Sequence, residues 1–364
     1  MADRGRRGDH MKHLDLMLGV AGLPGPELIR LSQRADGRGF RAIWVPEITY
    51  GDAMIMDAVI AANTRRIKVG TGVVGIYSRS PVVMAMQAFS LNEFFPGRGL
   101  LGLGTQAPGY VKNWHGAAYE HFIPRMREYI HIVRRITAGE RVTFEGKTLR
   151  IRNFQLMKPP LGEKIRIYIA AIAPGMIQLA GEIADGLFGY FYSTDYIRET
   201  VIPNLEIGAK RAKRSLDGFD IGSGYPTVVS PEGDAVELMK PHVMMYITGA
   251  ATTHGYVEMA RRAGFARDVE VIDAAIKRSD MRAAVAAVKP EMCRTFTICG
   301  TPAEAKALIE ARYEAGLTSV MLNTIPPGIY YRLNEGHFPP DVRDQTIEMG
   351  RYVKYIEAVI DSLG

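Results

Sequence analysis

The sequence predicts an α/β protein, a TIM (β/α)8 barrel with a helical insertion after its seventh strand. Short apolar runs alternate with segments of helical spacing along most of the 364 residues, which is typical of parallel strands joined by right-handed crossovers. The length suits a closed barrel of eight strands. An open doubly wound sheet is the alternative, but no glycine-rich dinucleotide fingerprint follows the first apolar run, and Gly102–Thr105 is too short to be one. These observations favour the barrel.

The boundaries between strands and helices are expected where the spacing of apolar residues changes from a short continuous run to a helical repeat. Strands are expected at 14–20, 41–45, 67–74, 99–104, 165–171, 187–191 and 221–229, followed by short runs at 295–299 and 319–322. Helices are expected at 26–38, 52–62, 81–95, 125–138, 174–184, 195–214, 301–315 and 344–360. The turn residues 145–147 predict a β-hairpin between 142–144 and 148–151. Thr301 and Glu304 have the spacing of a capping box, and 105–124 is expected to be irregular.

We expect a single barrel domain over residues 13–364. Residues 1–12 mix small residues with several basic ones and are expected to form a disordered N-terminal tail. Residues 231–289 contain several helical patterns and no strand. Because insertions in barrels gather at the active face, we expect this segment to roof the site.

The composition excludes several classes of protein. The net charge of +6 lies partly in the tail, and no basic stripe with interleaved aromatics predicts nucleic-acid binding. No apolar run is long enough to predict a membrane span, and no secretory signal is evident. Cys293 and Cys299 match no zinc pattern and are expected to be buried free thiols. We therefore expect a cytoplasmic protein that binds small organic molecules.

The candidate site residues follow the predicted strands, because reactive residues of a TIM barrel stand at the C-terminal ends of strands. These positions include Glu47, Gly75, Ile76 and Thr105. No clustered His and Asp residues predict a metal, and no nucleophile motif is present. Glycines and few charges suit a flat organic cofactor that brings its own chemistry. Glu47 can equally be a solvated loop acid, and Gly75–Ile76 can be a simple turn.

Two further candidates lie in the loops after the fourth and fifth strands. Ala173, Pro174, Gly175 and Met176 begin a helix, whose first N–H groups suit a phosphate; an ordinary helix start is the alternative. His115 lies in the long fourth loop and is a candidate proton donor, because imidazole titrates near neutral pH. A lone loop histidine can also be a structural hydrogen-bond partner.

Several motifs occur together in an order that resembles the luciferase-like monooxygenase superfamily of flavin- and deazaflavin-dependent oxidoreductases. They span most of the chain, from about residue 14 to 325. The segments are 42–47 (AIWVPE), 67–74 (IKVGTGVV), 78–81 (SRSP), 86–88 (MQA), 96–98 (PGR), 101–104 (LGLG), 114–116 (WHG), 125–129 (RMREY), 167–171 (IYIAA), 180–186 (AGEIADG) and 300–302 (GTP).

The resemblance implies a TIM barrel with an isoalloxazine or deazaflavin ring near its mouth. It also implies phosphate contacts at 173–176 and a ring-supporting non-proline cis peptide after the third strand, with Gly75–Ile76 as the matching position. Members that use coenzyme F420, such as methylene-tetrahydromethanopterin reductases, commonly carry an Asp-His pair after the second strand. This chain has Pro46–Glu47 there. The acid-base residue therefore stays open between His115 and Glu47, and FMN stays open beside F420.

Three functions follow as hypotheses. The first is an oxidoreductase that transfers a hydride between coenzyme F420 and a small organic substrate. The second is an FMN-dependent monooxygenase that uses O2 with a partner flavin reductase, and the third is a barrel that binds a cofactor without turnover. The resemblance also predicts a homodimer or higher homo-oligomer.

Overall fold

The structure is a computed structural model, and it describes residues 12–19, 23–231, 233–248, 254–324 and 342–364. Except for Lys12, the expected disordered tail lies outside the described residues. No helix in the described part of the chain is long and apolar enough to cross a membrane.

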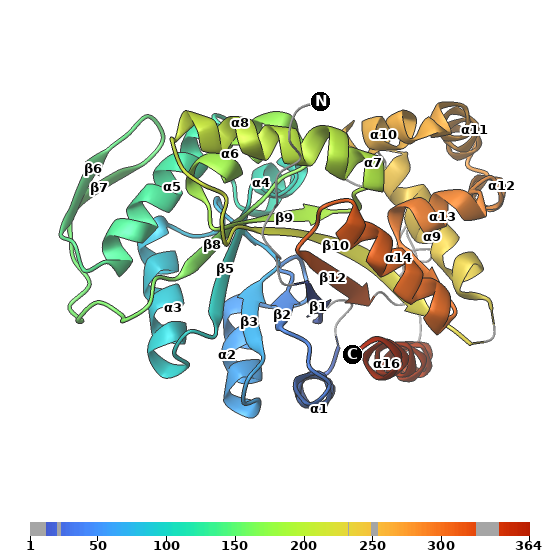
Figure 1. The fold of residues 1–364 in the computed structure, drawn as a ribbon, viewed down its shortest axis with the longest axis horizontal. Coiled ribbons are helices and arrows are strands. Elements are labelled where there is room, and N and C mark those ends of the chain that lie inside the picture. The colour runs from blue at the N-terminus through green and yellow to red at the C-terminus, as the bar shows by residue number, and fades with distance from the viewer. Residues whose placement is uncertain (1–11, 20–22, 232, 249–253, 325–341) are drawn as a thin grey trace, which may run out of the picture.

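Eight parallel strands form a closed barrel, which confirms the predicted fold class (Figure 1). They are β1 (His13–Met17), β2 (Ala42–Val45), β3 (Lys68–Thr71), β5 (Gly99–Gly104), β8 (Arg166–Ala170), β9 (Gly186–Tyr190), β10 (Asp220–Val229) and β12 (Ser319–Thr324). Each strand pairs with the next one in this order, and β12 pairs with β1 to close the ring. The carboxyl ends of all eight strands therefore open at the same end of the barrel.

Helices surround the barrel close to the predicted positions (Figure 1). They include α1 (Gly25–Gly37), α2 (Ala53–Asn63), α3 (Pro81–Phe94), α5 (Phe122–Thr137), α6 (Pro174–Ile183), α8 (Ile202–Arg211), α14 (Pro302–Glu314) and α16 (Val342–Leu363). The capping box at Thr301 and Glu304 is present. The predicted hairpin is also present, as β6 (Val142–Glu145) and β7 (Arg150–Phe154), and it projects at the left edge of Figure 1.

The insertion after β10 is helical, as the sequence predicted. It contains α9 (Ala235–Ile247), α10 (His254–Ala260), a π-helical segment (Arg261–Phe265), α11 (Ala266–Lys277) and α12 (Met281–Ala286). The strand expected at 295–299 is shifted, because α13 (Pro290–Phe296) takes its first two residues and β11 (Ile298–Gly300) forms later. This short strand pairs with the end of β10. The helices lie at the right side of Figure 1, opposite the hairpin.

Aromatic side chains fill the inside of the barrel. Trp44, Tyr168 and Phe188 pack edge to face, with Trp44 ring centroids 4.9 Å from Tyr168 and 5.3 Å from Phe188. Glycines on neighbouring strands make room for them. A Cβ at Gly186 would lie 2.3 Å from the Tyr168 ring, and one at Gly70 would lie 2.9 Å from the Trp44 ring. The barrel is therefore a packed core rather than a pore.

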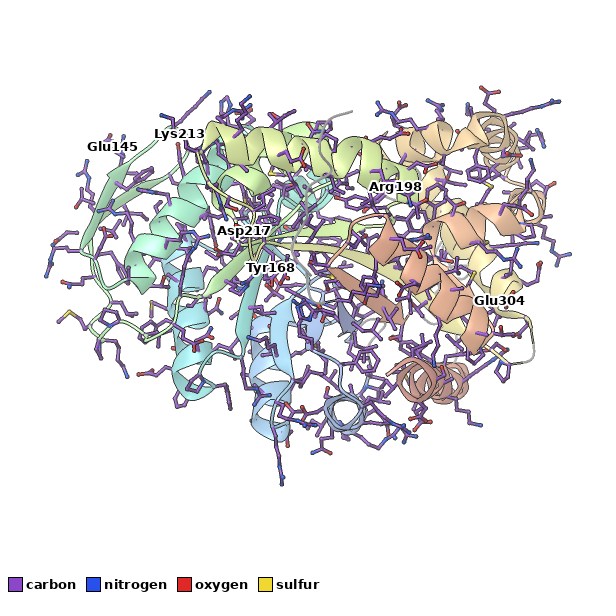
Figure 2. The ribbon with its side chains drawn as sticks, viewed as in Figure 1. Glu145, Tyr168, Arg198, Lys213, Asp217 and Glu304 are labelled. Atoms are coloured by element: carbon purple, nitrogen blue, oxygen red, sulfur yellow. The ribbon has the colours of Figure 1, made fainter. Side chains whose placement is uncertain are left out.

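An ion-paired network closes the N-terminal end of this core. Arg41 donates to Asp15 at 2.9 Å and to Asp220 at 2.8 Å. The Trp44 indole donates to Asp15 at 2.9 Å, and the Tyr168 hydroxyl donates to Asp220. Tyr168 lies near the middle of the molecule in Figure 2. Burial alone would raise the pKa of Asp220, but Arg41 and Tyr168 outweigh it and hold that pKa below its usual value.

Candidate functional site

The third strand is interrupted where the sequence predicted one continuous strand. It ends at Thr71, and a non-proline cis peptide joins Gly72 to Val73. The position predicted for this cis bond, Gly75–Ile76, is therefore wrong by three residues. The reason is that Gly75 lies in a separate short strand, β4 (Val74–Gly75), which pairs with β5, and the Ile76 amide donates to Gly104 O at 2.9 Å.

The end of β5 brings polar groups to the barrel mouth. Thr105 accepts a hydrogen bond from the Tyr119 hydroxyl at 3.2 Å. Gln106, at a φ of 59°, lies against Gly75, where a Cβ would come within 2.3 Å of its amide oxygen. That oxygen, Oε1, is buried and has no hydrogen-bond partner. A buried acceptor without a partner is costly, so Gln106 is suited to accept a hydrogen bond from a ligand.

Glu47 is held in an ion pair. Its two oxygens face the Arg79 guanidinium at 2.5 and 2.6 Å, and one of them also accepts from the Ala53 amide at 3.1 Å. Arg79 also contacts Asp52, the N-cap of α2. Glu47 therefore anchors the start of α2, which sequence reasoning did not foresee.

His115 is exposed at the C-terminal end of a short helix, α4 (Pro108–Trp114), within the segment that was expected to be irregular. The preceding Trp114 stacks on Tyr110 with ring centroids 4.0 Å apart. The structure thus gives His115 solvent access, whereas Glu47 is engaged by Arg79.

The predicted phosphate residues form the first turn of α6. Ala173, Pro174 and Gly175 are exposed, and Met176 is buried. Ala173 is the N-cap and cannot provide a side-chain cap, and the first turn contains no acidic residue. Pro174 has no N–H and the Met176 N–H donates to Ala173 O at 3.1 Å, so Gly175 is the residue of this turn whose N–H can meet an anion, as helix N-termini in general attract phosphate.

Sequence reasoning missed a polar group on the other side of the mouth. Asn323, at the end of β12, donates through Nδ2 to the Tyr190 hydroxyl at 2.8 Å, while its buried Oδ1 has no partner. Tyr190 shares a hydrogen bond with Tyr246 and lies 3.5 Å from His242 Nε2. Part of the signal was present, because Tyr190 lies near the end of the predicted strand 187–191, but Asn323 lies one residue beyond the predicted strand 319–322.

Burial controls the charge of this group. His242 is buried, and burial lowers its pKa to about 3, so the ring is neutral at physiological pH. Burial raises the pKa of Tyr246 to about 12. The wall formed by these side chains therefore carries no net charge.

A cavity of about 410 Å³ lies at the opposite end of the barrel, lined by Lys68, Gly99 and Arg166 at the starts of β3, β5 and β8. It contains none of the predicted site residues. The described residues also contain no cluster of His, Cys, Asp and Glu that could hold a metal ion. The candidate site is therefore the C-terminal mouth.

The fold is a TIM barrel with a helical insertion after its seventh strand, and residues suited to a ligand lie at the C-terminal mouth. The family model described as luciferase-like monooxygenase matches residues 11–319, and the chain belongs to this family. Its members are oxidoreductases that depend on F420 or FMN.

Individual relatives give a finer comparison. The chain is 28% identical to a 5,10-methylenetetrahydromethanopterin reductase of Methanolobus tindarius over 319 residues, which covers 84% of this chain and 93% of the relative. The coenzyme F420-dependent tetrahydromethanopterin reductase from Methanopyrus kandleri has a TM-score of 0.78 at 23% identity, over 97% of this chain and 98% of that one. The oxygenating constituent of 3,6-diketocamphane monooxygenase from Pseudomonas putida, in complex with FMN, has a TM-score of 0.60 at 18% identity, over 85% and 91%. These two structural likenesses show the fold.

Proposed function

We propose that this protein transfers a hydride between coenzyme F420 and a small organic substrate at the C-terminal mouth of the barrel. The observation that carries the proposal is that this mouth contains both a helix start without a side-chain cap, at α6, and a buried oxygen without a hydrogen-bond partner, Gln106 Oε1. Similarity at 28% identity to a putative coenzyme F420-dependent oxidoreductase of Mycobacterium tuberculosis supports the choice of cofactor.

The residues present fit such a cofactor. Both F420 and FMN carry a phosphate, which suits the Gly175 N–H at the start of α6, and a ring N–H, which suits Gln106 Oε1. On the β3–β5 side of the mouth, Gly104 leaves room for the Val73 side chain, because a Cβ at Gly104 would lie 2.6 Å from Val73 Cγ2. This side of the mouth is therefore flat, and we call it the cofactor wall. Val73 and Ala170 are half-buried at this level, so the wall offers apolar contact to a planar ring.

The deazaflavin, when bound, supplies the ring carbon that gives or takes a hydride. The chain holds the phosphate at 173–176, orients the ring with Gln106, and supports it with Val73 and Thr105. We assign the accompanying proton to His115, because Glu47 is occupied by Arg79. Holding the cofactor and the substrate in the reactive geometry can by itself accelerate a reaction strongly, without a covalent intermediate on the enzyme.

An FMN-dependent monooxygenase with a partner flavin reductase is the second candidate, favoured by the FMN complex among the structural neighbours. Titration of the purified protein with F420 and with FMN separates the two. We expect F420 to bind at least tenfold more tightly. Tighter binding of FMN would favour the monooxygenase, and binding of neither would favour a barrel without redox turnover.

The variant Ala173→Asp tests the phosphate site. An Asp at this N-cap should stabilise α6 by about 1 kcal/mol, because it caps free amides. It should also weaken cofactor binding at least tenfold, about 1.4 kcal/mol, because it occupies those amides and repels phosphate. The matched control is Gly162→Asp, which adds the same charge at an exposed position by the opposite end of the barrel. Equal affinity in both variants would contradict the assignment.

A further inference from the structure

Tyrosines from four separate segments meet around the mouth of the barrel. They are Tyr50 after β2, Tyr110 in α4, Tyr190 at the end of β9 and Tyr246 in α9. Tyr110 is close enough to Tyr50 and to Tyr246 to interact electrostatically with both, and the Tyr190 and Tyr246 ring centroids are 5.4 Å apart. All four are half-buried, as expected for side chains that line an opening. We call these four residues and Trp114, which stacks on Tyr110, the aromatic collar.

Tyr190 and the adjoining Asn323 face the cofactor wall across the barrel, whereas Tyr50 and Tyr110 follow β2 and β5, the two strands beside β3. In the ring of eight strands, β3 stands four strands from β10 in either direction. Tyr190 and Asn323 end the two strands that flank β10, and the Gly72–Val73 peptide follows β3. A molecule lying at the mouth would therefore contact Tyr190 and Asn323 on one side and the cofactor on the other, with Tyr50 and Tyr110 around its edge.

The collar carries no charged side chain. Its members are aromatic, and His242 beside it is neutral because burial lowers its pKa to about 3. The ionic cluster next to Tyr50 in the sequence contains Glu47, Asp52 and Arg79, and so has one excess negative charge. Arg79 is already engaged by both carboxylates, so an anionic ligand would find no free counter-charge in this group and would lose its hydration.

One polar atom in this wall still needs a partner. Asn323 is 7% exposed, its Nδ2 is used by Tyr190, and its Oδ1 accepts no hydrogen bond. Oδ1 can be satisfied by an O–H or N–H of a ligand, since leaving a buried acceptor unpaired is unfavourable.

We propose that the aromatic collar binds a neutral, planar ring compound, stacked beside Tyr110 and Trp114, whose O–H or N–H group donates to Asn323 Oδ1. This inference names the substrate class for the site and rests on the proposed function. Stacking on aromatic side chains accepts many kinds of planar ring. The selectivity of the collar therefore depends on the ligand's net charge and on its O–H or N–H donor.

Trp114 provides a direct test. The chain has two tryptophans, and Trp44 is fully buried, whereas Trp114 is 47% exposed. The F420-loaded protein is titrated with naphthalene-2-carboxamide and with 2-naphthoate, which share a ring but differ in charge and in the N–H donor. We expect saturable quenching of Trp114 by the carboxamide and at least tenfold weaker binding of the carboxylate.

Variants locate the binding. Trp114→Leu should abolish the fluorescence response and weaken carboxamide binding severalfold by calorimetry, and Asn323→Leu should weaken it about tenfold. The matched control is Phe94→Leu, an aromatic that is 75% exposed on α3 and outside the collar, and it should change nothing. Trp114 is exposed, so its variant tests the proposal even if Asn323→Leu does not fold.

The proposal is overturned by equal affinity for both probes, by no carboxamide binding, or by binding that neither collar variant changes. If F420 itself does not bind, the proposed function fails, and the same titration of the cofactor-free protein still decides the collar. If F420 binds and the carboxamide does not, the collar inference fails while the function stands.

Discussion

The two ends of the barrel satisfy their polar groups in opposite ways. At the N-terminal end, Arg41, Asp15, Asp220 and Tyr168 pair with one another, and Asp15 is fully buried. At the C-terminal mouth, the buried oxygens of Gln106 and Asn323 have no partner. The chain's own residues thus pair the buried carboxylates at one end, whereas two buried acceptors at the other end have no partner within the chain.

This difference indicates what each end contributes. A satisfied buried network holds the strands in register and, once a member is lost, leaves an unpaired charge. Unsatisfied acceptors beside half-buried aromatics lower stability in the free protein but gain hydrogen bonds on binding. We therefore expect substitutions at the first end to change unfolding, and substitutions at the mouth to change binding.

The largest expected effect is that of Arg41→Leu. It removes the shared partner of two carboxylates and leaves Asp15 buried without a counter-charge. The free energy of unfolding, measured by urea denaturation, should fall by about 3–5 kcal/mol. F420 affinity of the folded fraction should not change.

The matched control is Arg30→Leu, which breaks the exposed pairs with Glu27 and Glu357. It should cost at most about 1 kcal/mol, because solvent screens surface pairs. An equal cost for both substitutions would contradict the view that the N-terminal end is the stabilising one.

Glu47→Gln gives the next largest effect. Glu47 lies at the mouth but forms an ion pair with Arg79, so it tests whether a paired group at the mouth contributes to stability like the groups at the N-terminal end. The unfolding free energy should fall by about 1.5–3 kcal/mol, since a charge-assisted contact to Arg79 and to the start of α2 is lost. The neighbouring Asp52→Asn should cost less, because Asp52 is more exposed. Loss of hydride transfer with unchanged stability would instead assign Glu47 the proton.

The fold could be predicted from the sequence because its signals are local. Alternating apolar runs, Pro81 and Pro174 at helix starts, and the Thr301–Glu304 capping box each act over a few residues. The errors occurred where tertiary structure overrode such signals. The apolar run 67–74 is split because its second half pairs separately with β5, and Thr295 was drawn into α13.

The site was only partly predictable for the same reason. The exposed helix start at Ala173–Gly175 could be located from one strand-to-helix junction. The contact between Tyr190 and Asn323 joins residues 133 positions apart, and no local pattern indicates which strand ends face each other. Placing such pairs needs the closed strand order, which a single sequence does not contain.

Asp57 presents the same imbalance inside α2. Its carboxyl is fully buried, and neither oxygen has a hydrogen-bond partner. Burial is the main cause that raises its pKa well above the usual 3.8, and the negative charges of Asp52 and Glu47 add to it. A carboxyl with a raised pKa keeps its proton in the folded chain and releases it in the unfolded chain, so unfolding is favoured as the pH rises above about 4.

Asp57→Asn removes this titration while keeping the size of the side chain. We expect the variant to be more stable than the parent by about 1–2 kcal/mol at pH 7, with no difference near pH 4, in urea denaturation across that range. Asp361→Asn is the control with the opposite sign, because the hydrogen bond from Arg34 lowers the pKa of Asp361 and its stabilising effect is lost as the pH falls. A parent protein whose stability does not decrease between pH 4 and 7 relative to Asp57→Asn would show that the carboxyl finds a partner in solution.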